Sequence, residues 1–195
     1  SKEEGVTFEE VINHLEKIEQ SLDKAIRMDF SQEWQNNAFG KLPEAVTKSF
    51  IQNLIEPNKN LITLGGKRWR PLLMMLCYQM AAAKNKPLVN IEQAYDFTQL
   101  VEFVHTASLI HDDIEDGADL RRGKPTNHIV FGEALAILAG DALVTSAFGI
   151  IARLKNISPK LKVDLIDKLS FSAGAEGMVG GQVLDMLGEG QTLTL

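Results

Sequence analysis

The sequence predicts an all-α protein. Apolar residues recur at intervals of three and four over most of the 195 positions, and the period-two alternation of strands is almost absent. Hydrophobic residues make up 45% and charged residues 24% of the chain, the balance of a globular protein that buries a core. No repeat or linker divides the sequence, so we expect one domain over residues 1–195.

Start and stop signals place the helices in order along the chain. Thr7 followed by Glu10 is a capping box, and an apolar stripe continues from it. Pro43 and Pro71 suit first helical turns, and Asn90 is an expected N-cap. The expected helices are 8–28, 43–55, 70–84, 91–113, 130–154 and 160–186, with loops at 64–66, 84–90 and 117–127.

Charge and cysteine content exclude several classes of protein. The formal net charge of −6 argues against a general nucleic-acid binder, which usually carries a basic surplus. One cysteine, Cys77, rules out an internal disulfide and fits a reducing compartment, and we expect it to be packed in the apolar run 72–80. No signal-peptide pattern is visible in residues 1–30, so a cytoplasmic location is expected.

One apolar segment, Ala134–Ala152, is long enough to span a membrane. It carries Asp141 near its middle, and small and polar residues dilute its hydrophobicity. We therefore interpret it as a buried core helix with no membrane span, in which Asp141 is a satisfied buried polar group and not a metal ligand.

The chemistry is concentrated in the motif 111–116, His-Asp-Asp-Ile-Glu-Asp. Asp112 and Asp116 are four residues apart, which places them on one helix face about 6 Å apart along the axis. Their mutual repulsion, at the negative end of a helix dipole, favours a bound hard cation such as Mg²⁺ or Mn²⁺. A solvated acidic helix end is the alternative. A calcium EF-hand is excluded because Ile114 and Gly123 fall where oxygen ligands are needed.

Basic segments lie on either side of this motif, at 65–71 and 121–126. Glycines beside Lys67 and Arg70 just before a helix outline a phosphate cradle, although they could also be surface cations. The spacing of the ATP-binding P-loop is absent. An acidic motif between two basic segments suggests two phosphorylated substrates, one held through metal and one held directly by cations.

Five segments resemble the trans-type isoprenyl diphosphate synthases of the short-chain type, which include farnesyl and geranylgeranyl diphosphate synthases. In the family's order, they are residues 65–71, 102–116, 120–126, 140–143 and 177–185. The resemblance implies an all-α fold of antiparallel helices around a deep central cavity, an Mg²⁺-dependent prenyltransferase activity, and a homodimer.

The resemblance also implies roles for the acidic motif. Asp112 and Asp116 would bind Mg²⁺ that bridges the diphosphate of an allylic substrate (dimethylallyl, geranyl or farnesyl diphosphate), with Asp113 supporting and Arg121 contacting the same diphosphate. These four residues are the expected catalytic groups.

The second substrate implied by the resemblance is isopentenyl diphosphate. Its diphosphate would be held by four basic side chains: Lys67, Arg70, His105 and Arg122. Gln182 and Asp185 would face the site from an opposing helix. We leave His111 unassigned and expect Trp34 and Trp69 to be packing residues.

Product length is expected to depend on Ala107 and Ser108. They precede Asp112 by five and four residues, about 6–7.5 Å along the helix, where the tail of the allylic substrate would run. Both are small, and family members with an aromatic residue at this place tend to stop at farnesyl, so a product of geranylgeranyl length or longer is expected. The floor could instead be set deeper, for example by Phe97.

The sequence departs from the family in lacking its later Lys-Thr pair and second aspartate-rich motif; the Asp-x-x-Asp at 164–167 comes too early in the chain. A fragment of a synthase, a form that binds without turnover, and a non-catalytic subunit therefore remain alternatives. A terpene cyclase is a further alternative, which Lys67, Arg70 and Arg122 disfavour because a cyclase holds no second diphosphate.

Overall fold

The computed structural model describes residues 5–26, 33, 36, 40–46, 48–174 and 177–188. The chain forms two compact units, residues 1–150 and 151–195. The elements of the first unit are α1 (Phe8–Ile26), α3 (Lys48–Thr63), α4 (Trp69–Lys84), α5 (Ile91–Glu115), β1 (Leu120–Arg121), β2 (Lys124–Pro125), α6 (Asn127–Phe131) and most of α7 (Glu133–Arg153). The second unit contains α8 (Pro159–Ala173) and α9 (Met178–Gly188). The predicted all-α class is confirmed.

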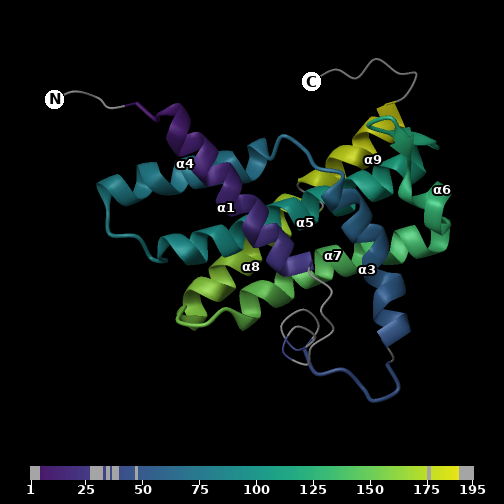
Figure 1. The fold of residues 1–195 in the computed structure, drawn as a ribbon, viewed down its shortest axis with the longest axis horizontal. Helices are drawn as coiled ribbons and strands as arrows, with labels where there is room; N and C mark the ends of the chain where they lie inside the picture. Colours follow the sequence, from purple (N-terminus) through teal and green to yellow (C-terminus); the bar gives the residue numbers. More distant parts are fainter. Residues whose placement is uncertain are drawn as a thin grey trace. The chain divides into compact units, whose positions relative to one another are not determined.

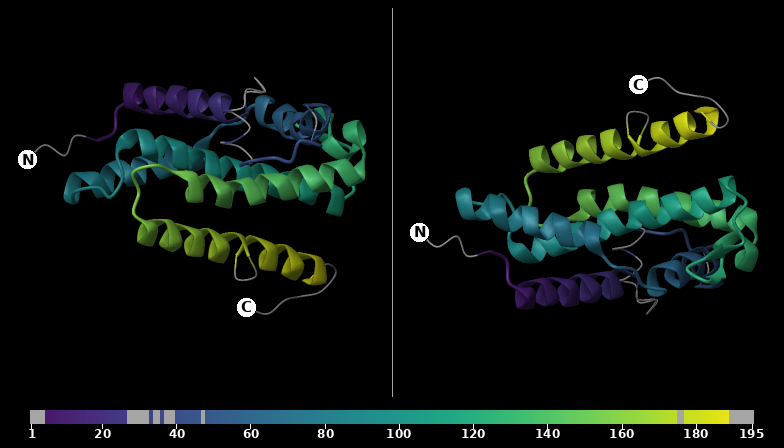
Figure 2. Two further views of the ribbon diagram at one scale, coloured as in Figure 1. Left: turned by 90° about the horizontal axis from the view of Figure 1, so that it is seen from below. Right: turned by 90° about the horizontal axis from the view of Figure 1, so that it is seen from above.

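Helix α5 is the centre of the first unit. It packs against α4, to which a short turn connects it, and α1 lies on one face of this pair (Figures 1 and 2). Helices α3 and α6 contact α5 nearer its carboxyl end. Twelve of the 25 residues of α5 are buried, from Ala94 to Asp113, so packing positions the helix along most of its length.

The capping residues predicted for α1 and α5 are confirmed. Thr7 Oγ1 accepts from the Glu10 amide at 3.2 Å, and the Thr7 amide donates to Glu10 Oε2 at 2.8 Å. Asn90 and Gln93 form the same reciprocal box at the start of α5. Each box satisfies amides that the first turn of a helix leaves without a partner in the helix.

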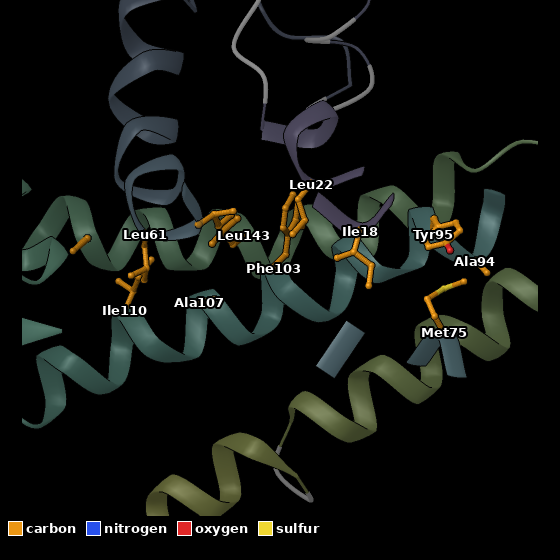
Figure 3. Packing of buried hydrophobic residues seen from close by; sticks show 12 residues of the cluster. Ile18, Leu22, Leu61, Met75, Ala94, Tyr95, Phe103, Ala107, Ile110 and Leu143 are labelled. Carbon is orange, nitrogen blue, oxygen red and sulfur yellow. The ribbon is translucent and has the colours of Figure 1, made fainter. Parts of the chain in front are cut away.

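The core of the first unit draws side chains from helices far apart in the sequence (Figure 3). Its labelled members include Ile18 and Leu22 of α1, Leu61 of α3, Met75 of α4, Phe103 and Ile110 of α5, and Leu143 of α7. Burying each side chain of this size stabilises the fold by roughly 1.5–3 kcal/mol. The cluster fixes α5 against its neighbours and so positions the residues that α5 presents.

The helix expected at 43–55 is wrong in both bounds. Pro43 opens a turn, in which its carbonyl accepts from the Val46 amide, and the helix of this region is α3, which runs through Pro57. A proline inside a helix costs about 3 kcal/mol. The buried residues Leu61 and Ile62 lie beyond Pro57, and their packing outweighs that cost.

Two long helices expected from periodicity are each interrupted by glycine. Gly132, with φ 88°, ends α6 and separates it from α7, so the helix expected at 130–154 is two helices. The helix expected at 160–186 breaks at 174–177 into α8 and α9, which run end to end in Figure 2. A Cβ on Gly174 would lie 2.6 Å from the Ser170 carbonyl oxygen, and a Cβ on Gly177 would clash with the Ser172 carbonyl oxygen, so both positions require glycine.

Helix α7 is buried along one face only. Its residues Ala136, Ala139 and Leu143 are buried, whereas Leu138 is 57% exposed. The helix is therefore less buried than the expected core helix, and Asp141 is exposed, not buried between helices. Among the described residues, α7 is the one helix long and apolar enough to cross a membrane by length and composition, with a third of its most apolar window buried.

Cys77 is exposed on α4, which contradicts its expected packing. The apolar run around it is periodic, and its buried residues, Pro71 and Met75, lie on a different face of the helix. The expectation failed because hydrophobicity over a window does not specify which face is buried.

Candidate functional site

The acidic motif is held at the carboxyl end of α5 by a defined helix stop. The Gly117 amide donates to the Ile114 carbonyl at 3.1 Å, and the Ala118 amide donates to the Asp113 carbonyl at 2.9 Å. Gly117 has φ 61°, so the pair of bonds is a Schellman motif, which requires a residue in the left-handed region. The last turn of α5 is thereby fixed, and its carboxylates lie where the helix ends.

The three aspartates of the motif differ in environment. Asp112 is half-buried and Asp116 is exposed, one turn apart, while Asp113 is buried. Arg121 binds Asp113 in a bidentate pair, with Nε donating at 2.8 Å and Nη2 at 2.7 Å, and Nη2 lies 3.7 Å from Asp112. These carboxylates, the hydrogen bond to Asp113 first among them, raise the pKa of Arg121 above its usual value.

The donor set fits a hard divalent cation held jointly with a substrate. Asp112 and Asp116 offer oxygen ligands only, which Mg²⁺ prefers. Within the described ranges, no three histidine, cysteine or carboxylate side chains gather into a group able to hold a metal by themselves. Mg²⁺ commonly keeps one or two carboxylates and takes its other ligands from water and substrate phosphates.

A tight hairpin after the acidic motif places Arg122. Strands β1 and β2 pair in antiparallel register, Leu120 with Pro125 and Arg121 with Lys124. The turn residues Arg122 and Gly123 have φ of 54° and 76°, as a type I′ turn requires. Arginine is uncommon there, and the turn brings its guanidinium against Gly66, where a Cβ would lie 3.3 Å from Nη2.

A cavity of about 260 Å³ lies where this hairpin meets the start of α4. It is lined by Gly66, Lys67, Arg68, Trp69, Arg70, Glu102, His105 and Arg122. The structure thus brings together the four basic side chains that the sequence resemblance assigned to one diphosphate, although they come from three separate segments. Four of the lining residues are lysine or arginine against one carboxylate, so the cavity favours an anion.

His105 is uncharged at neutral pH. Burial first, and then the charges of Arg70, Arg122, Arg121 and Arg68, lower its pKa to about 4. Arg70 Nη1 lies 3.2 Å from His105 Nε2, and because arginine can only donate, Nε2 accepts and the ring proton belongs on Nδ1. His105 thus orients Arg70 through a neutral ring.

Sequence reasoning missed the role of Arg68 and misread Trp69. Arg68 is buried and forms ion pairs with Glu19 at 2.6 Å and Glu102 at 2.8 Å. Its partners are 49 and 34 residues away in the sequence, so no local pattern reveals them. Trp69 is 53% exposed, with its ring 4.4 Å from the Arg70 guanidinium carbon, so the expected packing role is wrong; Trp34 lies outside the described residues.

The two residues expected to set product length have different surroundings. Ser108 is half-buried, and its hydroxyl donates to the His105 carbonyl at 2.6 Å. Ala107 is fully buried in the core. Five residues correspond to a rotation of about 140° around a helix and four to about 40°, so Ser108 shares the face of Asp112 and Ala107 does not.

Three further residues singled out by the sequence are His111, Gln182 and Asp185. His111 is near α7, with Nε2 3.2 Å from the Ile137 carbonyl and 3.5 Å from Asp141. Gln182 is half-buried on α9 in the second unit, and the side chain of Asp185 lies outside the described residues. That these two residues face the site stays a prediction.

Comparison with known proteins gives one consistent family. The family model described as polyprenyl synthetase matches residues 51–194. The chain is 52% identical over 162 residues to a farnesyl diphosphate synthase of Geobacillus stearothermophilus, covering 78% of this chain and 52% of that protein. It is 42% identical over 158 residues to the farnesyl diphosphate synthase of Bacillus subtilis, covering 79% of this chain and 49% of that protein.

Solved structures agree with the sequence relatives. An FPP/GFPP synthase from Zymomonas mobilis superposes with a TM-score of 0.69 at 34% identity, covering 95% of this chain and 62% of that chain. A geranyltransferase from Legionella pneumophila superposes with a TM-score of 0.76 at 25% identity, and the match covers 95% of this chain and 58% of that chain. The chain spans about half the length of the curated relatives it matches. With a family model matched over most of its length, the chain belongs to the polyprenyl synthetase family.

Proposed function

We propose that the protein containing this chain is a prenyltransferase that condenses isopentenyl diphosphate with an allylic diphosphate to give farnesyl or geranylgeranyl diphosphate. The observation that supports this best is the pairing of two different sites in one unit. One is the acidic end of α5 with Arg121, and the other is the cation-lined cavity. A reaction between two diphosphate substrates needs both.

The residues divide between the substrates by their chemistry. Asp112 and Asp116 would hold Mg²⁺ against the allylic diphosphate, with Mn²⁺ as a substitute, and Arg121 would contact the same group. Lys67, Arg70, His105 and Arg122 would bind the diphosphate of isopentenyl diphosphate directly. Arginine suits this task because its planar guanidinium offers paired donors to phosphate oxygens.

The reaction needs charge stabilisation and the exclusion of water more than a nucleophile. The C–O bond of the allylic diphosphate breaks, and the alkene of isopentenyl diphosphate forms the new C–C bond with the allylic carbon. The carbon next to the new cation then loses a proton, which the departing diphosphate can accept. Bound Mg²⁺ supplies positive charge to the leaving diphosphate. Arg121 adds a fixed positive charge at that place, held by Asp113.

Further properties are proposed from the sequence and from the family resemblance that it carries. We propose a homodimer that works in the cytoplasm on isoprenyl diphosphates, without nucleic-acid partners. Gln182 is proposed to complete the site from α9, and Ser108 and Ala107 to limit the growing chain.

Turnover of isotopically labelled isopentenyl diphosphate with dimethylallyl, geranyl or farnesyl diphosphate tests the proposal in the complete protein. Product should form only with an allylic partner and Mg²⁺. Asp112→Ala should lower turnover at least about 100-fold while the melting temperature is kept, because removing one of several repelling acids leaves the helix end intact. Glu115→Ala, an exposed acid in the same turn, is the matched control.

Three outcomes would contradict the proposal. Cyclised product from an allylic diphosphate alone would identify a terpene cyclase. Binding of both substrates without product by the complete protein would identify a non-catalytic subunit. Near-normal turnover of Asp112→Ala would reject the metal assignment.

A further inference from the structure

Arg68 lines the anion cavity yet directs its guanidinium to protein groups on three helices. Its Nε donates to Glu19 of α1 at 2.6 Å, its Nη1 to Glu102 of α5 at 2.8 Å, and its Nη2 to the Ile62 carbonyl of α3 at 2.8 Å. All three guanidinium nitrogens therefore have protein acceptors. Burial would lower the pKa of Arg68, but its two carboxylate partners outweigh burial and raise the pKa, so the side chain stays charged.

The backbone at Arg68 is also unusual. Arg68 is the N-cap residue of α4 and has φ 50° and ψ 29°, in the left-handed region. Within the described ranges, the non-glycine residues with positive φ are Arg68, Arg122 and Asn156, and both arginines line the cavity. Such conformations are energetically costly and persist where the surroundings hold them. Here the three hydrogen bonds of the guanidinium hold the side chain of the residue that adopts this conformation.

Arg68 and its neighbours direct their side chains to different places. Arg68 is turned toward the protein interior, while Lys67 before it and Arg70 after it line the cavity. We propose that Arg68, Glu19 and Glu102 form a positioning network that fixes Lys67 and Arg70 for anion binding. The proposed function supplies the identity of the natural anion, but the network itself can be tested with inorganic diphosphate.

Loss of the Glu102 charge should change anion affinity in the direction opposite to that expected from simple electrostatics. Glu102 lines the cavity proposed to bind an anion, so its charge by itself would repel the ligand. Removing that charge should tighten binding if Glu102 is only a nearby acid. If Glu102 holds Arg68 and thereby Lys67 and Arg70, removing the charge should weaken binding.

Substitution of Glu19 offers a second test, which is less affected by loss of folding stability. Breaking a buried ion pair by removing one partner strongly destabilises the fold, which applies to Arg68 and Glu102. The Glu19 side chain is 54% exposed, so its loss leaves a smaller defect. Both carboxylates should nevertheless shift anion affinity in the same direction.

The experiment is calorimetric titration of the complete protein with inorganic diphosphate at neutral pH. Glu102→Gln should raise the dissociation constant for diphosphate about tenfold, which corresponds to the loss of one charge-assisted hydrogen bond. Glu19→Gln should raise it by less. Glu92→Gln, which removes an equal charge from the exposed first turn of α5, should stay within about twofold. Unchanged or tighter binding by Glu102→Gln and Glu19→Gln would overturn the inference.

Arg68→Lys separates positioning from charge. Lysine keeps the charge but cannot offer three nitrogens in a plane, so affinity should fall as far as in Glu102→Gln. Wild-type affinity in folded Arg68→Lys would overturn the inference. If this variant does not fold, as judged by circular dichroism, Glu19→Gln decides the outcome.

The failure of the inference can be told apart from failure of the proposed function. A wild type that binds inorganic diphosphate but does not turn over isopentenyl diphosphate contradicts the proposed function, and the sign of the Glu102→Gln effect still decides the network. A wild type that does not bind inorganic diphosphate overturns the network.

Discussion

Asp113 holds Arg121 by two hydrogen bonds, 2.8 Å from Nε and 2.7 Å from Nη2, and this pair joins the buried carboxylate of the acidic motif to the hairpin that follows it. The same guanidinium lies 3.7 Å from Asp112. Asp113 therefore supports the proposed allylic site through Arg121, whereas Asp112 is open enough to bind a cation.

Asp113→Asn should lower the free energy of unfolding by about 2 kcal/mol, because it removes the charge from a pair of charge-assisted hydrogen bonds. It should also raise KM for the allylic diphosphate, since Arg121 loses its anchor. Chemical denaturation and steady-state kinetics check the two effects. Asp116→Asn, at an exposed position, should change stability by less than about 0.5 kcal/mol and so serves as the control. Equal stability losses in both variants would show that the pair contributes nothing specific.

Gly66→Ala should raise KM for isopentenyl diphosphate severalfold with little loss of stability. The added Cβ would lie 3.3–3.4 Å from the Arg122 guanidinium nitrogens, so the guanidinium must shift from its present place in the cavity lining. Gly123→Ala is a contrasting variant: nothing lies within 4 Å of its Cβ, but its φ of 76° makes it strained, so stability should fall instead. A Gly66→Ala enzyme with unchanged KM would show that Arg122 does not bind this substrate.

Stability should fall as the pH is lowered from about 6.5 toward 4, in part because of His105. Its pKa of about 4 in the folded protein lies below the value of about 6.5 expected in the unfolded chain. In that window the unfolded state binds the proton and the native state does not, so acid favours unfolding. His105→Gln should flatten this part of the pH profile of unfolding. An unchanged profile would contradict the neutral ring.

Ser108→Phe should shorten the product, because Ser108 shares the half-open face of Asp112. Ala107→Phe places an aromatic ring where family members that stop at farnesyl tend to have one, so it should also shorten the product to farnesyl diphosphate. The ring must enter a packed core, which typically costs about 1–3 kcal/mol of stability. Product analysis with melting temperatures checks both variants. Unchanged products from folded forms of both would show that neither residue lines the tail path.

The sequence predicted the fold class and the ends of α4 and α5 because periodicity and capping residues act locally. It misjudged α3, where packing of Leu61 and Ile62 outweighs the cost of Pro57, and it missed the break at Gly132 inside an apolar stretch.

In the candidate site, too, features that depend on local sequence were predicted, and features that depend on tertiary packing were not. Motif resemblance identified the basic residues that the structure gathers at one cavity. It could not identify Arg68 as a buried ion-pair centre, since its partners Glu19 and Glu102 are brought to it only by tertiary packing. For Ala107, the prediction from the sequence used the distance along the helix from Asp112 and did not consider which face of the helix the residue occupies.

The central claim is that two separate sites bind the two diphosphates, and Arg122→Ala tests it most directly. Steady-state kinetics of the complete protein, with both substrates varied, should show KM for isopentenyl diphosphate raised at least about tenfold and KM for the allylic diphosphate within about twofold. Lys124→Ala, an exposed cation of the same hairpin outside the cavity lining, should change neither constant. Equal increases in both constants for Arg122→Ala would contradict two separate sites.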